Sequence, residues 1–506
     1  MNLIAFGMKK NYFFTLCLLA IAPALFSQKL AHTSISRTNI NLRGNPVTLG
    51  QLTINAPAPG KIILRFDGNC LSSPGDRIVL AASQTTNWGI NDDCVELESA
   101  NEDVNSNPFS HTRAYDVAAG DHTFYAVAQN FYELDGDGIA SVYGSLTAEW
   151  FPEIPGQAFA RHKGFTAENI FVEGAPLPFS NLTIEAPVSG KVLVRFDGKC
   201  VSSYGDLMFF AASNTPNWGD YDGSTSNEVI DNDLNRFSFS HVRTYNVGPG
   251  SHTFYAVVEN YYEVYGNGFA SIFGSLTVQF YPDPVVPNLA FKSITTPFGV
   301  NIEGPPVTVG QFSMNAPVAG KVAINLVGTC IGSFGDQIRL AASKVPDWLP
   351  EDGNIHFEPY SSDLNRISFS HTRVYDVAPG THDFYAVIQN TEEFEGSGLA
   401  VVYASFTGQF FPEGTIATQE PERFQKVTIS PNPATDQVTL AFPGWSNEAL
   451  SFSLCDERGQ VLKQMEKSEQ DNSEQLQWEV SNLPAGIYFI RMTHASGVAV
   501  RKFVRL

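Results

Sequence analysis

Histidine and arginine recur together at one position of the sequence, at intervals of 130 residues, and could bind a carboxylate. They stand in FSHTRAYDV, FSHVRTYNV and FSHTRVYDV, which begin at Phe109, Phe239 and Phe369. The pairs are His111 with Arg113, His241 with Arg243, and His371 with Arg373. Such residues could instead hydrogen-bond backbone at a sandwich edge or pair with a recurring acid, because ionisable groups also form purely structural networks. We favour the structural role.

A tryptophan follows each Ala-Ala-Ser tripeptide by a few residues. The three are Trp88, Trp218 and Trp348, in TNWG, PNWG and PDWL. A tryptophan in a loop beside Asn or Asp could stack on a sugar ring while polar neighbours bind the hydroxyl groups. A tryptophan that caps the open end of a sandwich is the alternative. We treat these three residues as predicted ligand-binding residues with that alternative left open.

Oxygen-bearing side chains two residues apart recur upstream of each histidine. The pairs are Asp103 with Asn105, Asp233 with Asn235, and Asp363 with Asn365. Ca²⁺ needs six to eight oxygen ligands, which such loops could begin to supply. Asp and Asn are also ordinary turn residues, so the pattern is compatible with no metal at all. The sequence therefore allows calcium but requires no cofactor.

A second charged pair is present in only two of the three copies. Arg65 with Asp67 and Arg195 with Asp197 become Asn325 and Val327 in the last copy, so a reaction that needs the pair could not occur there. Loss of an exposed ion pair would cost only about 0–1 kcal/mol. The chain also lacks HExxH, GxSxG, a phosphate-binding glycine loop and CxxC. We expect no enzyme.

Cysteines occupy an equivalent position in each copy, and a fourth cysteine follows the first of them. The equivalent residues are Cys70, Cys200 and Cys330. A small buried apolar side chain at one core position is a simpler explanation than a redox or metal site. A disulfide between Cys70 and Cys94 is allowed if the protein is exported.

Charge and the N-terminus indicate export. The formal charge of −21 argues against nucleic acid as a partner. Lys9 and Lys10 precede an apolar run over residues 12–22, which is typical of a secretory signal peptide cleaved after Ser27. No other stretch approaches the ~20 apolar residues of a membrane-spanning helix, so we expect none in the mature chain.

Long segments recur with the same spacing as the histidines and divide the chain into three similar parts. GKIILRFDG returns as GKVLVRFDG and GKVAINLVG, and GDRIVLAAS returns as GDLMFFAAS and GDQIRLAAS. We predict a signal peptide at 1–27, repeats at 28–155, 156–286 and 287–413, a linker at 414–424 and a last domain at 425–506. Each repeat is long enough to hold its own core.

The repeats read as β-structure. In KIILRFD, Ile62, Leu64 and Phe66 alternate with polar residues, which is the period of a half-buried strand. Turn residues separate the runs, so we predict an all-β fold of three antiparallel, jelly-roll-like sandwiches followed by a small sandwich. Residues 369–377 and 382–387 read as a β-hairpin, with His382 opposite Asp376 or Val377 and His371 opposite Ala386 or Val387.

The last domain carries several ordered motifs. These are Pro431-Asn432-Pro433-Ala434-Thr435-Asp436, Gly459, Leu483-Pro484-Ala485-Gly486-Ile487-Tyr488, and Lys502-Phe503. Over residues 425–506 the chain resembles the C-terminal sorting domain of the type IX secretion system of Bacteroidota. The resemblance implies a small β-sandwich read by the secretion machinery, and a protein that is secreted or held at the outer-membrane surface. Cys455 is not part of the resemblance and is predicted to lie in the core.

The repeats are similar in size, and in the GTHDFYAV segment, to C1q- and TNF-like jelly rolls, which work as trimers. This resemblance implies that three units in one chain could form a pseudo-trimer. We expect a non-catalytic adhesion or binding protein whose partners include glycans or surface polysaccharide. The alternatives are a structural matrix protein without a small ligand, and a carbohydrate-active enzyme whose site carries no recognisable motif.

Overall fold

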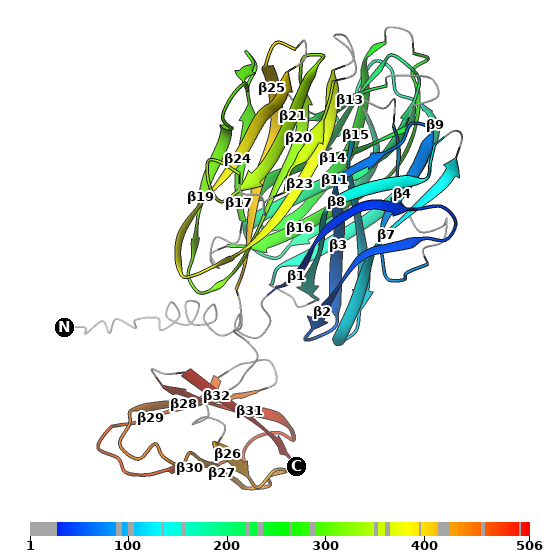
Figure 1. Ribbon diagram of the computed structural model, residues 1–506. Helices are drawn as coiled ribbons and strands as arrows, with labels where there is room; N and C mark the ends of the chain where they lie inside the picture. The colour runs from blue at the N-terminus through cyan, green and yellow to red at the C-terminus, as the bar shows by residue number, and fades with distance from the viewer. Residues whose placement is uncertain are drawn as a thin grey trace, which may run out of the picture. The chain divides into compact units, whose positions relative to one another are not determined.

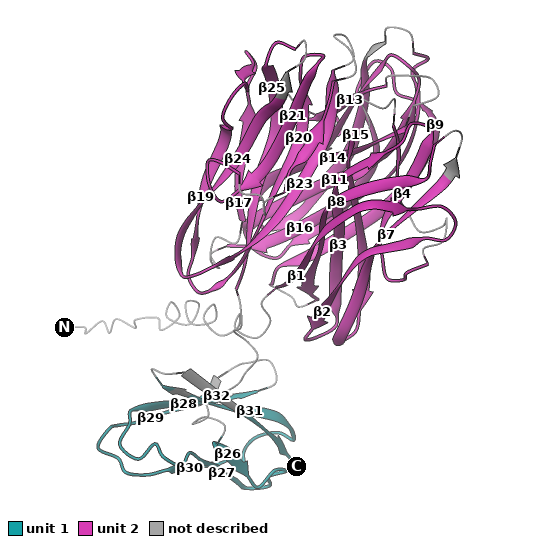
Figure 2. Cartoon of the chain, viewed as in Figure 1, with its two compact units in different colours: residues 1–27, 414–506 teal, residues 28–413 magenta. Residues whose placement is uncertain are grey.

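The computed structural model describes residues 28–87, 94–99, 106–133, 136–153, 157–218, 223–229, 236–263, 266–283, 289–348, 353–359, 365–393, 396–412, 426–456, 461–494 and 497–506. The strands fall into two compact units, one within residues 28–413 and one whose described residues begin at Lys426 (Figure 2). The described residues contain no helix and hence none that could cross a membrane. The prediction of an all-β fold is confirmed.

The first repeat is an eight-stranded jelly roll. One sheet has the order β1-β8-β3-β6 and the other the order β2-β7-β4-β5. Consecutive strands therefore lie in different sheets except for β4 and β5, which pair with each other, as in a jelly roll. Its strands are β1 (Lys29–Asn41), β2 (Val47–Ala56), β3 (Gly60–Ser72), β4 (Asp76–Ser83), β5 (Val95–Glu98), β6 (Ser106–Val117), β7 (Gly120–Glu133) and β8 (Ile139–Pro152).

The second and third repeats have the same strand order. The second has β9 (Phe159–Phe171), β10 (Leu177–Ala186), β11 (Gly190–Ser202), β12 (Asp206–Ser213), β13 (Thr225–Glu228), β14 (Arg236–Val247), β15 (Gly250–Glu263) and β16 (Phe269–Pro282). The third has β17 (Leu289–Thr295), β18 (Val300–Asn301), β19 (Val307–Ala316), β20 (Gly320–Ile331), β21 (Asp336–Ser343), β22 (Ile355–Phe357), β23 (Arg366–Val377), β24 (Gly380–Glu393) and β25 (Leu399–Pro412). Its first strand is split into β17 and β18, which both pair with β25.

The predicted hairpin is wrong. β23 pairs with β20, whereas β24 pairs with β19 and β21, so the turn at residues 378–380 carries the chain from one sheet to the other. An alternating pattern identifies two strands and the turn between them, but it does not state which neighbours they bond to. His382 closes this turn, because its Nε2 lies 2.7 Å from the carbonyl oxygen of Ala378.

The three repeats lie side by side (Figure 1) and contact one another through edge strands of both of their sheets. β6, β14 and β23 are in mutual contact, and each repeat offers a different edge to the next. β5 packs on β14, β13 on β23, and β22 on β6, so the third repeat returns to the first. A head-to-tail contact that closes on itself makes a ring. One chain thus builds a pseudo-threefold assembly.

Closure of the ring buries residues that the strand pattern assigned to solvent. Arg65 and Asp67 were predicted on the exposed face of their strand, but both are buried. That face of β3 packs against the neighbouring repeats rather than facing water. An apolar cluster drawn from all three repeats covers part of the same contact. It contains Ile63, Phe151, Ala160, Leu193, Val242, Tyr281, Leu289 and Val327.

The C-terminal unit has two small sheets, ordered β26-β27-β30 and β29-β28-β31-β32. Its strands are β26 (Thr428–Ser430), β27 (Gln437–Ala441), β28 (Leu450–Asp456), β29 (Val461–Lys467), β30 (Gln475–Glu479), β31 (Gly486–His494) and β32 (Gly497–Arg505). Trp445, Trp478 and Phe503 lie in its core. Cys455 is also buried, as predicted.

Candidate functional site

The recurring histidine is part of the scaffold. Nδ1 of His241 accepts a hydrogen bond from the backbone N–H of Ala212 at 2.8 Å, while the hydroxyl of Tyr245 donates to the carbonyl oxygen of the same residue at 2.9 Å. Both side chains come from β14 and the alanine from β12, so they join the two sheets across the core. His111 and His371 bond to Ala82 and Ala342 in the same way, at 2.9 Å.

The strands that carry the histidines, β6, β14 and β23, turn their opposite face toward the neighbouring repeats. There they take part in a buried polar contact along the pseudo-threefold axis. Asp67 accepts hydrogen bonds from the hydroxyls of Thr372 and Ser370 in the third repeat, at 2.6 and 3.2 Å. Thr112 of the first repeat donates likewise to Asp197 of the second. Burial raises the pKa of Asp67, which Arg65 and the two hydroxyls counteract. The aspartates therefore link repeats.

Symmetry-related residues near the axis differ, so that fewer like charges meet than in three identical copies. Glu149 of the first repeat corresponds to Gln279 and Gln409, and both amides donate to its carboxylate, at 2.6 and 3.4 Å. Arg195 donates to the side-chain oxygen of Asn325 at 2.5 Å, where a third arginine would stand if the copies were identical. Buried like charges disfavour one another strongly.

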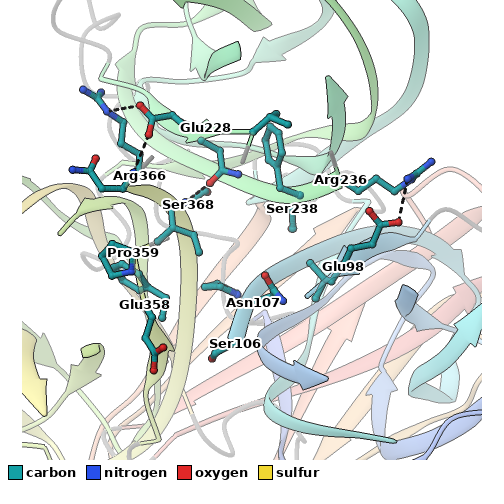
Figure 3. A pocket seen from close by; sticks show the side chains of 18 residues that line it. Glu98, Ser106, Asn107, Glu228, Arg236, Ser238, Glu358, Pro359, Arg366 and Ser368 are labelled. Atoms are coloured by element: carbon teal, nitrogen blue, oxygen red, sulfur yellow. Dashed lines mark hydrogen bonds and ion pairs between the residues drawn. The ribbon is translucent and has the colours of Figure 1, made fainter. Parts of the chain in front are cut away.

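A small cavity is lined by equivalent residues of all three repeats (Figure 3). Glu98 pairs with Arg236 at 3.1 Å, and Glu228 pairs with Arg366 at 3.3 Å. Ser106 takes the position of the arginine at the third contact and donates to the carbonyl oxygen of His356 at 2.8 Å. The cavity holds only about 80 Å³, and the residues that line it join the repeats through these pairs.

An exposed aromatic cluster surrounds one of the predicted ligand-binding tryptophans. The half-buried Trp218 packs edge-on against Phe209, with ring centroids 5.6 Å apart, and Phe209 lies 5.6 Å from the ring of Tyr261. Tyr261 is 69% exposed. Glu259 lies opposite Phe209 on the adjacent strand and accepts a hydrogen bond from Trp218; burial raises its pKa. Three aromatic rings and one carboxylate thus share a surface of the second repeat.

The other tryptophans differ in their surroundings. Trp348 is half-buried, but Arg339 and Thr391 stand where the second repeat has Phe209 and Tyr261. Trp88 lies outside the described residues. Phe209, Glu259 and Tyr261 were not singled out from sequence, because they are not shared by the three copies. A search for aromatic residues present in only one copy would have found Phe209, but not Tyr261, whose position holds Phe131 in the first copy.

Most of the predicted calcium ligands lie outside the described part of the chain. These are Asp103, Asn105, Asp233, Asn235 and Asp363. Asn365 is described, and its backbone N–H donates to Glu228 at 3.0 Å at the contact between the second and third repeats. Among described residues no group of three or more His, Cys, Asp or Glu could hold a metal ion. Calcium remains a prediction.

The equivalent cysteines are buried core residues, as expected. Cys70, Cys200 and Cys330 are free thiols, and burial raises the pKa of Cys70 to about 12. The structure forms no disulfide between Cys70 and Cys94. Cys94 lies instead at the contact with the second repeat, 3.8 Å from Nζ of Lys199.

The motif residues of the C-terminal unit secure its last strand. The side-chain amide of Asn432 donates to the carbonyl oxygen of Lys502 at 3.1 Å and accepts from the N–H of Val504 at 3.0 Å. Ala434 continues the ladder, since its N–H donates to Val504 at 2.8 Å. The side-chain amide of Asn432 therefore pairs with the backbone of β32 as a neighbouring strand would.

Two further motif residues, Tyr488 and Asp436, hold neighbouring segments of the C-terminal unit in place. The hydroxyl of Tyr488 donates to the carbonyl oxygen of Pro484 at 2.8 Å, and its ring stacks on Phe503 at 5.6 Å. The carbonyl oxygen of Asp436 accepts from Val480 and Ser481. Pro431 and Pro433 flank Asn432, Gly486 begins β31, and Gly459 lies outside the described residues.

Residues 428–505 match the family model described as a secretion system C-terminal sorting domain. The C-terminal unit is a sorting domain. It directs the protein through the type IX secretion system to the cell surface or the extracellular space, and the secretion machinery is therefore one partner of the chain.

No curated protein matches the sequence. Among solved structures, the chain is similar to a β-glucuronidase of Faecalibacterium prausnitzii, with 11% identity over 44% of this chain and 47% of the enzyme, at a TM-score of 0.13. It thus spans less than half the length of that enzyme. PNGase F of Flavobacterium meningosepticum matches at 10% identity over 51% and 97% of the two chains, with a TM-score of 0.25. A Sulfolobus turreted icosahedral virus chain matches at 10% identity over 77% and 92%, with a TM-score of 0.18. TM-scores this low carry no argument about function.

Proposed function

We propose that the protein is an exported, non-catalytic binding protein whose three-repeat ring attaches to glycans. The aromatic cluster of Trp218, Phe209 and Tyr261 is the observation that carries the proposal. Aromatic rings bind the apolar faces of sugars, and a carboxylate such as that of Glu259 accepts hydrogen bonds from sugar hydroxyls. Export through a sorting domain places this surface where polysaccharides are met.

The buried contacts between the repeats also support a binding role. The buried contacts hold three jelly rolls in one arrangement, so a ligand-binding surface on one repeat is presented on a rigid body. Rigid presentation lowers the entropy lost on association. A structural matrix protein without a small ligand could be built from the same ring. Glycan binding distinguishes the binding protein from the matrix protein.

A glycan array of the whole exported chain tests the proposal, run with calcium and with EDTA. We expect W218A combined with Y261A to weaken binding at least about tenfold, as loss of central aromatic contacts does. W348A is the matched control, because Arg339 and Thr391 hold the positions of Phe209 and Tyr261 in the third repeat, and it should bind like the unaltered chain. Absence of binding, or equal binding by the double variant, would favour the structural role. Sensitivity to EDTA would support calcium at the Asp-x-Asn loops.

A further inference from the structure

A second cavity lies between the third repeat and the first, away from the aromatic cluster. It has a volume of about 560 Å³, within the range of small-molecule sites. Equivalent spaces at the other two contacts hold about 290 Å³ and essentially nothing. Equivalent strands of the repeats build the three contacts, but the side chains that line them differ.

Cationic and donor groups of the third repeat line one wall of this cavity. Arg339 comes from β21, Arg373 and His371 from β23, and His356 from β22. A Cβ atom placed on Gly353 would lie 3.5 Å from Nη1 of Arg373 and 3.8 Å from Nε2 of His371. These two donor atoms therefore point toward the same region.

Within the described residues neither arginine has an acidic partner. No carboxylate of a described residue lies within ion-pair distance of Arg339 or Arg373. Nε of Arg339 and Nε2 of His356 are buried without a hydrogen-bond partner, and the latter is 3.7 Å from the carboxylate of Glu358. Asp67 is the one acidic residue in the lining, and Thr372 and Ser370 already donate to it. In a chain of net charge −21, an accumulation of unpaired cations is unusual.

The first repeat supplies the opposite wall with neutral polar groups. Ser34, Ser36 and Ser145 carry hydroxyls, Asn69 an amide and Tyr143 a phenol. Hydroxyls and amides of this kind exchange hydrogen bonds with a polyhydroxylated ligand. The cavity therefore combines a site for an anion with a lining suited to the remainder of a sugar.

The two other contacts lack this combination. Between the first and second repeats, Glu96 and Lys199 form an ion pair at the positions of His356 and Asn69. Between the second and third, Phe209 stands at the position of Arg339, and the guanidinium of Arg243 lies over the ring of Phe291 at 5.6 Å. The cations at these contacts already have partners.

We propose that the cavity between the third and first repeats binds a sugar that carries an anionic group, either a carboxylate or a sulfate. Arg339 and Arg373 contact the anion, because guanidinium groups bind both oxyanions through paired N–H donors. The hydroxyls of the first repeat contact the sugar ring. This inference uses residues separate from the aromatic cluster and does not depend on the proposed function.

Isothermal titration of the whole exported chain tests the site with three probes: glucuronate, glucose 6-sulfate and glucose. We expect one of the two anionic sugars to bind and glucose not to bind. R339Q and R373Q should each weaken that binding about ten- to a hundredfold, as loss of a charge-assisted hydrogen bond does. Which anionic sugar binds identifies the anion.

R113Q is the matched control, since Arg113 holds the position of Arg373 at the closed contact between the first and second repeats. It should leave binding of the anionic sugar unchanged. A thermal melt of each variant separates loss of binding from loss of folding. No binding of either anionic sugar, equal binding of glucose, or equal weakening by R113Q would overturn the proposal. The W218A and Y261A variant should retain this site whatever its effect on the glycan array.

Discussion

At the scale of single residues, the recurring histidine is a neutral hydrogen-bond acceptor rather than a ligand. Nδ1 of His241 can accept from Ala212 only when it carries no proton. Burial lowers the pKa of His241 to about 3, and Arg243 and Arg195 add to this effect. The unfolded chain has the usual value of about 6.5. The folded protein therefore binds fewer protons here than the unfolded chain, and this contribution to stability is full above pH ~6.5 and is lost as the pH falls toward 3.

This sign gives a testable pH dependence. Between pH 7.5 and pH 4.5, we expect the difference in unfolding free energy between the unaltered chain and H241N to shrink by about 2–3 kcal/mol, because only the unaltered chain must keep this imidazole neutral. Urea titrations at both values measure it. H252N is the control, since His252 is a partly exposed residue whose Nε2 bonds to the carbonyl oxygen of Gly248 within its own turn. A difference that stays constant with pH would show that His241 does not titrate on unfolding.

At the scale of strands, three near-copies of one sequence had to diverge where they meet. β3, β11 and β20 bring Arg65, Arg195 and Asn325 to equivalent places, and β8, β16 and β25 bring Glu149 and two glutamines together. In the first set one arginine is replaced by Asn325, which accepts a hydrogen bond from Arg195. In the second set two glutamates are replaced by Gln279 and Gln409, which donate to Glu149. The third repeat, with Asn325 and Val327, is the uncharged version of the contact rather than a copy that lost a function.

The second repeat can be converted to that uncharged version. D197V alone removes the carboxylate beside the buried Arg195, which lies 3.7 Å away, and should lower the unfolding free energy by about 3–5 kcal/mol. R195N with D197V should recover at least half of that loss, because no buried cation is then left without an anion. Chemical denaturation of both variants measures the effect. A double variant less stable than D197V would contradict an ion pair as the source of the loss.

At the scale of the whole ring, no repeat completes its own polar contacts. The hydroxyls that donate to Asp67 belong to Ser370 and Thr372 of the third repeat, and Thr112 of the first repeat donates to Asp197. Closure within one chain satisfies all three contacts and leaves none to recruit a second copy.

Truncation tests this closure. We expect the unit of residues 28–413 to be monomeric and to unfold in one cooperative transition. A chain that ends at residue 286 leaves two contacts open, so it should self-associate and unfold at a lower urea concentration. Sedimentation velocity and urea titration measure both properties. A stable monomer of two repeats, with the same midpoint as the ring, would show that the contacts contribute little to stability.

Several features of this protein follow from sequence alone because they depend on local patterns. The period of two in KIILRFD predicts strands, and equal spacing predicts three equal units. The motifs from Pro431 to Lys502 identify the sorting domain before any strand is placed, because short turns and strand ends carry them.

Other features were decided only by tertiary structure. Alternation assigns Arg65 and Asp67 to the face opposite the core but cannot say whether water or another repeat covers that face. It finds the strands on either side of Gly380 but not that they belong to different sheets. The cavity between Arg339, Arg373 and the first repeat joins residues about 300 positions apart in the chain, and only closure of the ring brings them together. Local patterns specify which way a side chain points along its own strand, whereas burial depends on what the rest of the chain places against it.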